Sequence, residues 1–251
     1  MNNDVLICHR FIKEPATYKF VTHAHDKWEF IFVIKGNPTC MTEGKRYFIK
    51  EKTLIVFKPA QIHRVQELVA HPYEYYFLMC DESLLSPRAI EKLSSSNGIF
   101  MFKDSEEIHR KLAELERQNE GNIASMREKL FLIEALLNDM LENIGENTEL
   151  VLWSEDSLIS TAISYIEANI QNVVRVDQIC KAVGVKKERL YSRFIQSMLI
   201  SPMKYVRAKR AALAELEFSN EQSRNEILKR YGFKDEENFA QEYNAFCRSV
   251  H

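Results

Sequence analysis

The segment THAHDKWEFIFVIKG, residues 22–36, places two histidines and a glutamate in a run that is mostly apolar and β-prone. In a strand, side chains two residues apart point to the same side, so His23, His25 and Glu29 are predicted to share one face. Imidazole nitrogens and carboxylate oxygens bind zinc, nickel, iron or manganese, and inward histidines also hydrogen-bond organic molecules. Polar groups in an apolar interior are costly unless something satisfies them. The motif therefore predicts a bound metal ion, organic ligand or water cluster here.

Short β-prone runs separated by turn residues fill the chain between residues 17 and 81. The predicted strands are 28–34, 46–49, 53–57, 62–66 and 73–79. Five closely spaced strands joined by hairpin turns predict an antiparallel barrel or sandwich. Trp28, Phe30 and Phe32 point to the opposite side of their strand from Glu29, and we expect them to be packing residues.

Beyond residue 81 the spacing of apolar residues becomes helical, and helices are predicted at 105–119 and 123–144. The apolar positions of the second helix are spaced alternately by three and four residues: Ile123, Met126, Leu130, Ile133, Leu137, Met140 and Ile144. This spacing is that of a coiled-coil seam, and it is also common in helical hairpins within one chain. A dimer contact and an intramolecular contact both stay open. Residues 145–155 are predicted to be a linker.

Everything after residue 156 has the pattern of short helices. They are predicted at 157–170, 176–183, 187–198, 202–218, 224–231 and 236–246. Two of the helix pairs are separated by a glycine, Gly184 or Gly232, which supplies the left-handed residue that a sharp turn needs. The second helix of each pair is predicted to present a free face to a DNA major groove. Ser223 and Glu226 are predicted to form a capping box.

Bulk properties narrow the class of protein. A chain of 251 residues is about right for two domains, and its five cysteines include no C-x-x-C pair. We therefore expect free thiols in a reducing cytoplasm, and we find neither a secretion signal nor an apolar run that would span a membrane. From residue 157 onward there are 15 Lys and Arg against 11 Asp and Glu, whereas the rest of the chain is net acidic. This asymmetry favours a polyanionic partner for the back half.

The last 95 or so residues resemble the DNA-binding domain of AraC-type transcription regulators. The matching positions are Gly184, Leu190, Phe194, Ser201, Pro202, Arg210, Ala214, Ile227, Gly232, Phe233, Asp235 and Phe239. The resemblance implies two helix-turn-helix units, joined by the 202–218 helix, that bind successive major-groove turns of double-stranded DNA. It also implies that Leu190 and Phe194 are core residues.

The same resemblance implies roles for residues around the first recognition helix. Those implied to face the groove are Glu188, Arg189, Tyr191 and Ser192, and those implied to hold phosphates are Lys186, Lys187 and Arg193. The second recognition helix departs from the family pattern, because Asp235, Glu236, Glu237 and Glu242 would repel phosphates. It binds weakly, reads bases through Asn238 and Gln241, or is degenerate; the sequence leaves these alternatives open.

The front half resembles the cupin sensor domain that such regulators often carry. His23, His25, Glu29 and Gly36 match the first cupin motif, and the second motif is reduced to Pro59 and His63. On a barrel, His63 is expected to reach the first three polar side chains from a nearby strand. An organic effector and a divalent metal ion (Zn, Ni, Fe or Mn) both remain open as the ligand, and no cofactor is assigned.

Together these patterns predict an α+β fold, with an N-terminal cupin-like antiparallel β-barrel, a helical hairpin and a C-terminal all-α domain of two helix-turn-helix units. The predicted parts are a sensing barrel at 1–104, a dimerising hairpin and linker at 105–156, and a DNA-binding domain at 157–251. The predicted function is effector-controlled transcription regulation by a cytoplasmic homodimer, without catalysis or membrane contact and with RNA polymerase as a candidate partner. The alternatives are a cupin metalloenzyme and a regulator relative that acts through dimerisation without binding DNA.

Overall fold

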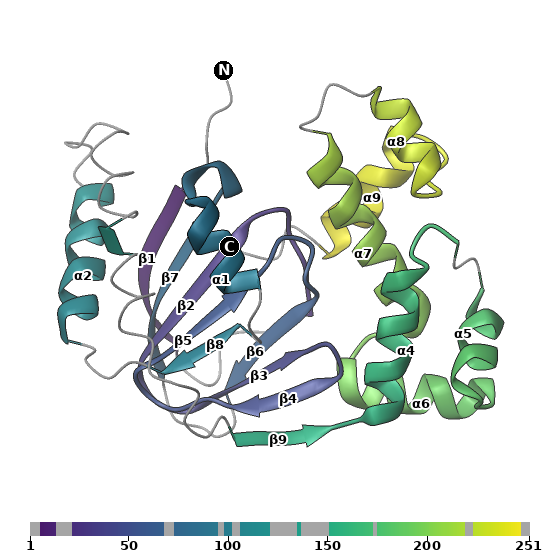
Figure 1. Cartoon of the computed structure of the whole chain (residues 1–251), viewed down its shortest axis with the longest axis horizontal. Coiled ribbons are helices and arrows are strands. Elements are labelled where there is room, and N and C mark those ends of the chain that lie inside the picture. Colours follow the sequence, from purple (N-terminus) through teal and green to yellow (C-terminus); the bar gives the residue numbers. More distant parts are fainter. Residues whose placement is uncertain are drawn as a thin grey trace.

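The computed structural model describes residues 6–13, 22–67, 73–94, 98–101, 106–120, 135–136, 151–172, 175–218 and 223–246. Within them, two antiparallel sheets form the N-terminal part, and six helices pack beside these sheets as the C-terminal part (Figure 1). This arrangement confirms the predicted fold class. No helix in the described ranges is long and apolar enough to cross a membrane.

The larger sheet has five strands in the order β1-β7-β2-β5-β8, and every neighbouring pair is antiparallel. The strands are β1 (Leu6–Lys13), β7 (Tyr73–Cys80), β2 (Trp28–Lys35), β5 (Thr53–Phe57) and β8 (Ile99–Met101). Strands β1 and β8, at the two edges, were not predicted. Each depends on a partner far away in the sequence, which the local residue pattern does not reveal.

The smaller sheet has the order β6-β3-β4-β9. It consists of β6 (His63–Glu67), β3 (Pro38–Thr42), β4 (Lys45–Phe48) and β9 (Val151–Glu155). Strand β9 lies in the segment predicted to be a linker, and it pairs with β4 from Lys45 opposite Glu155 to Phe48 opposite Val151. Without β9, the edge of β4 would leave backbone N–H and C=O groups unpaired. Strand β9 pairs with these groups just before the chain enters the helical part.

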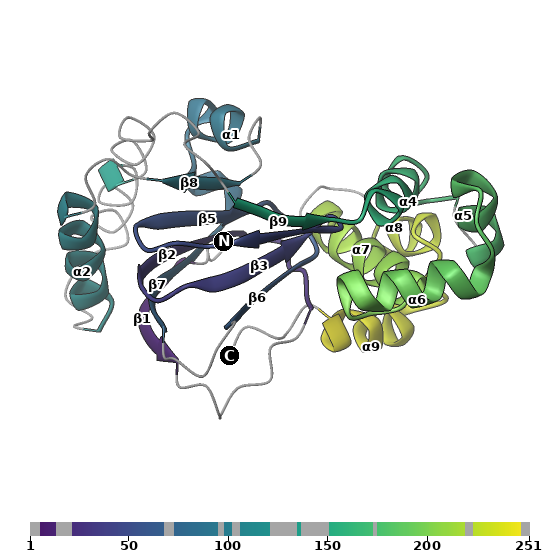
Figure 2. The ribbon, with the colours of Figure 1, turned by 90° about the horizontal axis from the view of Figure 1, so that it is seen from below.

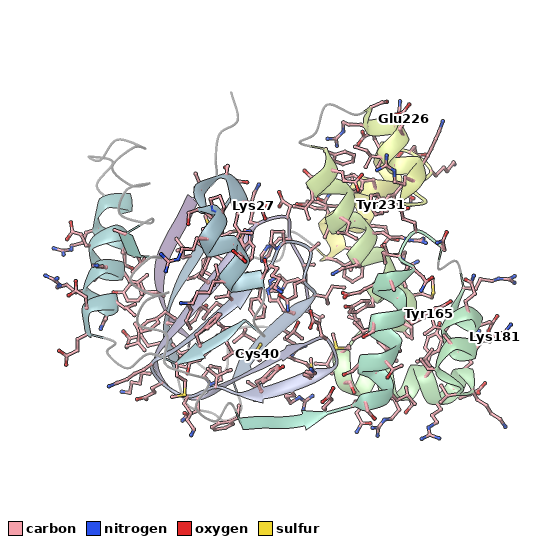
Figure 3. All side chains as sticks on the ribbon, viewed as in Figure 1. Lys27, Cys40, Tyr165, Lys181, Glu226 and Tyr231 are labelled. Carbon is pink, nitrogen blue, oxygen red and sulfur yellow. The ribbon has the colours of Figure 1, made fainter. Side chains whose placement is uncertain are left out.

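The two sheets lie against each other (Figure 2). They enclose one apolar core, and a second apolar core lies on the outer face of the larger sheet. The enclosed core contains Cys40, which is labelled in Figure 3, together with Ile31, Val33 and Phe57. On the outer face, α1 (Pro87–Ser94) and α2 (Glu106–Glu120) flank the sheet. Trp28, Phe30 and Phe32 are buried there, which confirms that they are packing residues.

The C-terminal part follows the predicted helices closely. It contains α4 (Ser157–Ala168), α5 (Val176–Val183), α6 (Lys187–Met198), α7 (Pro202–Glu217), α8 (Arg224–Arg230) and α9 (Glu236–Phe246). Gly184 and Gly232 have positive φ angles of 68° and 79°, as a sharp turn after the first helix of each unit requires. Leu190 and Phe194 are fully buried in the core that α6 shares with its neighbours, as expected.

The capping pattern differs from the prediction in one place. Ser223 precedes α8, but its side chain makes no capping hydrogen bond, so the predicted capping box with Glu226 is wrong. The amide of Glu226 bonds to the Ser223 carbonyl oxygen instead, at 2.9 Å. Ser201 caps α7 and Asp156 caps α4 through their side chains. The predicted seam from Ile123 to Ile144 lies outside the described residues and stays a prediction.

Candidate functional site

Four polar side chains converge where the two sheets meet the helical part. The Oε2 atom of Glu29 lies 2.6 Å from Nε2 of His25, 3.4 Å from Nε2 of His63 and 4.0 Å from Nε2 of His23. One ligand atom from each residue lies within 4.8 Å of the other three. The structure thus brings together the residues of the first cupin motif and the single histidine of the reduced second motif.

The route by which the chain assembles this cluster differs from simple strand alternation. Strand β2 begins only at Trp28, so His23 and His25 lie in a preceding segment that bends at residues 26–27. That segment runs alongside the start of β6, where His23 and His63 exchange two backbone hydrogen bonds of 3.0 and 2.9 Å. The histidines therefore reach Glu29 across a bend in the chain and not as neighbours on one strand face.

Hydrogen bonds fix the tautomers of two of the histidines. Nδ1 of His25 lies 2.9 Å from the Lys27 carbonyl oxygen, and Nδ1 of His63 lies 2.8 Å from that of Gln61. A carbonyl oxygen only accepts, so each Nδ1 carries a hydrogen. The Nε2 atom that faces Glu29 is then a lone pair when the ring is neutral and a hydrogen-bond donor when the ring is protonated. Metal-binding histidines commonly donate their second N–H to a carbonyl in this way.

The cluster is almost completely withdrawn from solvent. The side chains of His25, Glu29 and His63 are at most 4% exposed, and that of His23 is 14% exposed. Burial by itself raises the pKa of Glu29, but the charge of His63 and the hydrogen bond from His25 outweigh it and hold the pKa well below its ordinary value. The site thus favours a carboxylate surrounded by groups that carry, or bind, positive charge.

The donor set fits a divalent transition metal ion. When the imidazoles are neutral, their lone pairs face the carboxylate, so hydrogen-bond acceptors face acceptors at a nearly buried site. This arrangement costs free energy unless a cation or protons lie between them. The buried Nε2 of His63 has no hydrogen-bond partner in the part of the chain that is described. Three imidazoles and one carboxylate suit zinc, nickel, iron or manganese.

Neighbouring residues hold His63 in place, and sequence inspection did not identify them. The ring of Phe57 stacks on His63 with centroids 3.7 Å apart. Gln61 donates to Thr42 Oγ1 at 3.0 Å and accepts from the Lys58 amide at 3.0 Å, which braces the loop that leads to His63. Because neither residue belongs to a recognisable motif, only their positions beside His63 could have indicated these roles.

The residues implied to contact DNA remain accessible on the first helix-turn-helix unit. Tyr191 is half-buried, and the other six are exposed: Lys186, Lys187, Glu188, Arg189, Ser192 and Arg193. Arg193 is engaged within the chain, because its Nε lies 2.8 Å from Oδ2 of Asp156. The geometry therefore leaves the N-terminal half of α6 exposed to solvent, while its C-terminal half contacts the start of α4.

In the second unit, several of the carboxylates that are expected to repel phosphates have partners within the chain. Glu236 pairs with Arg224 and Glu242 with Arg207, while Asp235 Oδ1 accepts from the Asn238 amide at 2.8 Å, as a helix cap does. Gln241 is exposed. The side-chain oxygen of Asn238 accepts from the Lys234 amide at 3.4 Å. These contacts reduce the negative charge that α9 presents, and a role for Asn238 and Gln241 in base recognition stays a prediction.

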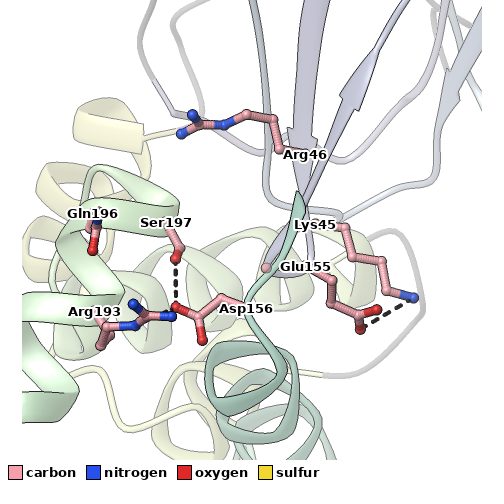
Figure 4. Close-up of a pocket in the computed structure, with 8 residues that line it drawn as sticks. Lys45, Arg46, Glu155, Asp156, Arg193, Gln196 and Ser197 are labelled. Atoms are coloured by element: carbon pink, nitrogen blue, oxygen red, sulfur yellow. Dashed lines mark hydrogen bonds and ion pairs between the residues drawn. The ribbon is translucent and has the colours of Figure 1, made fainter. Parts of the chain in front are cut away.

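A cavity of about 220 Å³ separates the β4–β9 edge from α6 (Figure 4). On one wall, Asp156 accepts a hydrogen bond from Ser197 Oγ at 3.0 Å and pairs with Arg193. Asp156 was not identified from the sequence, although an aspartate directly before a helix is a recognised capping signal. This residue joins β9, α4 and α6 at one point.

The chain is similar to known proteins in its sequence pattern and in its structure. The sequence pattern of the AraC-like ligand binding domain matches residues 10–136, just over half of the chain. Among solved structures, the chain is similar to ToxT from Vibrio cholerae, with 10% identity and a TM-score of 0.43 over 96% of this chain and 94% of that one. The structure of unsaturated fatty acid-bound ToxT from strain SCE256 gives 12% identity and a TM-score of 0.42, over 98% and 92%.

The AraC-like transcriptional activator CuxR gives 16% identity and a TM-score of 0.39, over 84% of this chain and 74% of that one. At these identities and TM-scores the structural likeness carries no argument about ligands, and the family assignment depends on the sequence match. By that match, the chain belongs to the AraC-like ligand-binding domain family, that of the AraC-type transcription regulators.

Proposed function

We propose that this chain is a DNA-binding transcription regulator whose barrel senses a ligand at His23, His25, Glu29 and His63, and that a divalent transition metal ion is this ligand or holds it. The observation that carries the proposal is the convergence of three imidazoles and a carboxylate on one buried point. Family membership favours regulation over catalysis for this donor set. When bound, the ion would supply a positive charge to the lone pairs and an attachment point for an anionic or carbonyl-bearing effector.

Metal analysis of the full-length protein tests the site. We expect one transition metal ion per chain after purification, or after dialysis against a chelator followed by addition of Co²⁺. His25→Gln should weaken Co²⁺ binding by at least about tenfold, since it removes one of four ligands. His109→Gln is the matched control, because His109 lies on α2, where its ring packs against Tyr76. Equal Co²⁺ binding by wild type and His25→Gln would contradict the proposal.

The proposal of DNA binding is supported by the exposed basic residues of the first unit and by its turn glycine. Selection from a random duplex library, followed by a salt titration, measures it with the full chain. Lys187→Ala should reduce the slope of log affinity against log salt by about 0.9, as expected for one lost phosphate contact. Lys50→Ala removes the same charge from an exposed barrel position and should leave the slope unchanged. If the chain binds no duplex even at low salt, the result would favour the alternative that it is a regulator relative that acts through dimerisation without binding DNA.

We also infer that the chain forms a homodimer through the seam from Ile123 to Ile144. Its supporting observation is the regular spacing of three and four residues. Light scattering of the full chain should give twice the monomer mass of 29.4 kDa, and Leu130→Lys should return it to the monomer. If the wild-type chain has the mass of a monomer, the dimer proposal is refuted and the seam is interpreted as a contact within one chain. The parts proposed at 1–104, 105–156 and 157–251 follow from the same sequence patterns.

A further inference from the structure

The segment that carries His23 and His25 faces the polar site on one side and the helical part of the chain on the other. His23 and His25 point to Glu29, whereas the residues between and beside them, Thr22, Ala24 and Asp26, contact the helical part. Thr22 and Ala24 are buried, with exposed fractions of 2% and 0%. Alternation along this short segment thus places candidate ligands on one side and contacts with another part of the chain on the other.

The contacts on the second side involve the C-terminal ends of both recognition helices. Thr22 Oγ1 donates to the carbonyl oxygen of Met198, the last residue of α6, at 2.9 Å. The Ala24 amide donates to the carbonyl oxygen of Phe246, the last residue of α9, at 3.1 Å. The hydroxyl of Tyr243, also on α9, donates to Asp26 Oδ1 at 3.3 Å. One short segment therefore satisfies helix-end carbonyls in both DNA-binding units.

The loop that leads to His63 repeats this alternation. Ala60 and Ile62 are buried in the same apolar cluster as Ala24, Phe194 and Phe246, while His63 faces the polar site. The two ligand-bearing segments are tied to each other by the Ala60 amide, which donates to the His25 carbonyl oxygen at 2.7 Å, and by the bridge between His23 and His63. The surface on which the helices dock is thus built from both segments together.

We propose that occupation of the four-residue site clamps these two segments together and thereby fixes the ends of both recognition helices against the barrel. The inference rests on the metal site proposed above. Without a cation, and with the imidazoles neutral, lone pairs face a carboxylate and oppose the close approach of the segments. With the site filled, the docking surface formed by Ala24, Ala60 and Ile62 is complete, so the docked form is the one with higher affinity for the ion.

Because of thermodynamic linkage, the proposal can be tested by changing the docking contacts and measuring the affinity of the site for the ion. If filling the site favours docking by a given factor, then docking raises the affinity of the site for the ion by the same factor, so a variant that populates the undocked form should bind the ion more weakly. The double variant Thr22→Val with Tyr243→Phe removes two hydrogen-bond donors from the interface and leaves all four candidate ligands in place. Tyr165→Phe is the control, since it removes a hydroxyl from α4 (Figure 3) that makes no hydrogen bond to the barrel among the described residues.

The measurements are a Co²⁺ titration followed by absorbance and amide hydrogen exchange on the full chain, with and without Co²⁺. We expect the double variant to bind Co²⁺ at least about fivefold more weakly than wild type, and the control to bind it equally. Co²⁺ should also slow exchange in the last turns of α6 and α9 of wild type, helices that carry none of the four residues, and should do so less in the double variant.

Three outcomes are distinguishable. Weaker Co²⁺ binding with altered exchange at the two helix ends supports the coupling. The coupling is refuted, and the metal site is retained, if the double variant binds Co²⁺ as tightly as wild type and if Co²⁺ does not change amide exchange in α6 and α9. A wild-type protein that binds no Co²⁺ overturns both. If the double variant does not fold, as judged by circular dichroism, Tyr243→Phe alone takes its place, because it removes a single hydroxyl from a half-buried side chain.

Discussion

Replacement of Asp156 by alanine should destabilise the chain by an amount that its three contacts predict. Its Oδ1 accepts from the Ile159 amide at 3.4 Å, a long capping bond that we take as about 0.5–1 kcal/mol. The bond from Ser197 to the charged Oδ2 contributes about 1.5 kcal/mol. The pair with Arg193, whose side chain is 48% exposed, adds at most about 0.5 kcal/mol. The sum is about 2–3 kcal/mol.

For a chain of this length each kcal/mol lowers the melting temperature by about 2–4 °C, so Asp156→Ala should melt about 5–10 °C below wild type. Asp156→Asn keeps one oxygen and a good capping residue, and should lose about half as much. Arg193→Ala should shift the melting temperature by less than about 2 °C. Differential scanning calorimetry of the four proteins measures this order. A loss in Arg193→Ala as large as that in Asp156→Ala would refute the reasoning, because it would place the stability in the exposed ion pair.

Three further predictions concern other parts of the fold. Gly44→Ala should lower the melting temperature by several degrees, because φ is +76° there and a Cβ would lie 2.9 Å from a backbone nitrogen of α4. Burial raises the pKa of Cys80 from its ordinary value to about 12 and that of Cys40 still further, so peptide mapping should find neither thiol alkylated at pH 8 until the protein unfolds. Labelling of either thiol in the native protein would contradict this expectation. The stability that the protonated Cys80 contributes should be complete below about pH 9 and lost as the pH rises toward 12, which urea unfolding over this pH range measures. Leu190→Ala should cost about 2–5 kcal/mol in urea unfolding, whereas the half-exposed Ile195→Ala should cost less than about 1 kcal/mol.

The helices of the C-terminal part were predictable because their signals are local. The boundaries of α5, α6 and α9 agree with the apolar periodicity and with the glycines that follow α5 and α8. The convergence of His63 on the first motif followed from the resemblance to the cupin sensor, not from spacing. The prediction that His23 and His25 lie on the same strand as Glu29 was wrong, because the chain bends at residues 26–27. Neither residue is a glycine or proline, so the sequence does not indicate this bend.

Features that depend on distant contacts were beyond the sequence pattern. Strands β1 and β9 exist because β7 and β4 offer free edges, and five-residue β9 has no pattern of its own strong enough to indicate this. The acidic side chains of α9 seemed unfavourable for DNA because their partners, Arg224 and Arg207, lie on other helices. Thr22 carried no signal at all, since its contact with Met198 spans 176 positions in the sequence.

Strand β9 has a practical consequence for dividing the protein experimentally. A sensor fragment that stops at residue 150 would leave β4 as a bare edge, and an unprotected edge invites intermolecular strand pairing. Such a fragment should precipitate or form higher oligomers that say nothing about the native assembly. A fragment ending after Glu155 retains the complete four-stranded sheet, so studies of the isolated sensor should place the cut there.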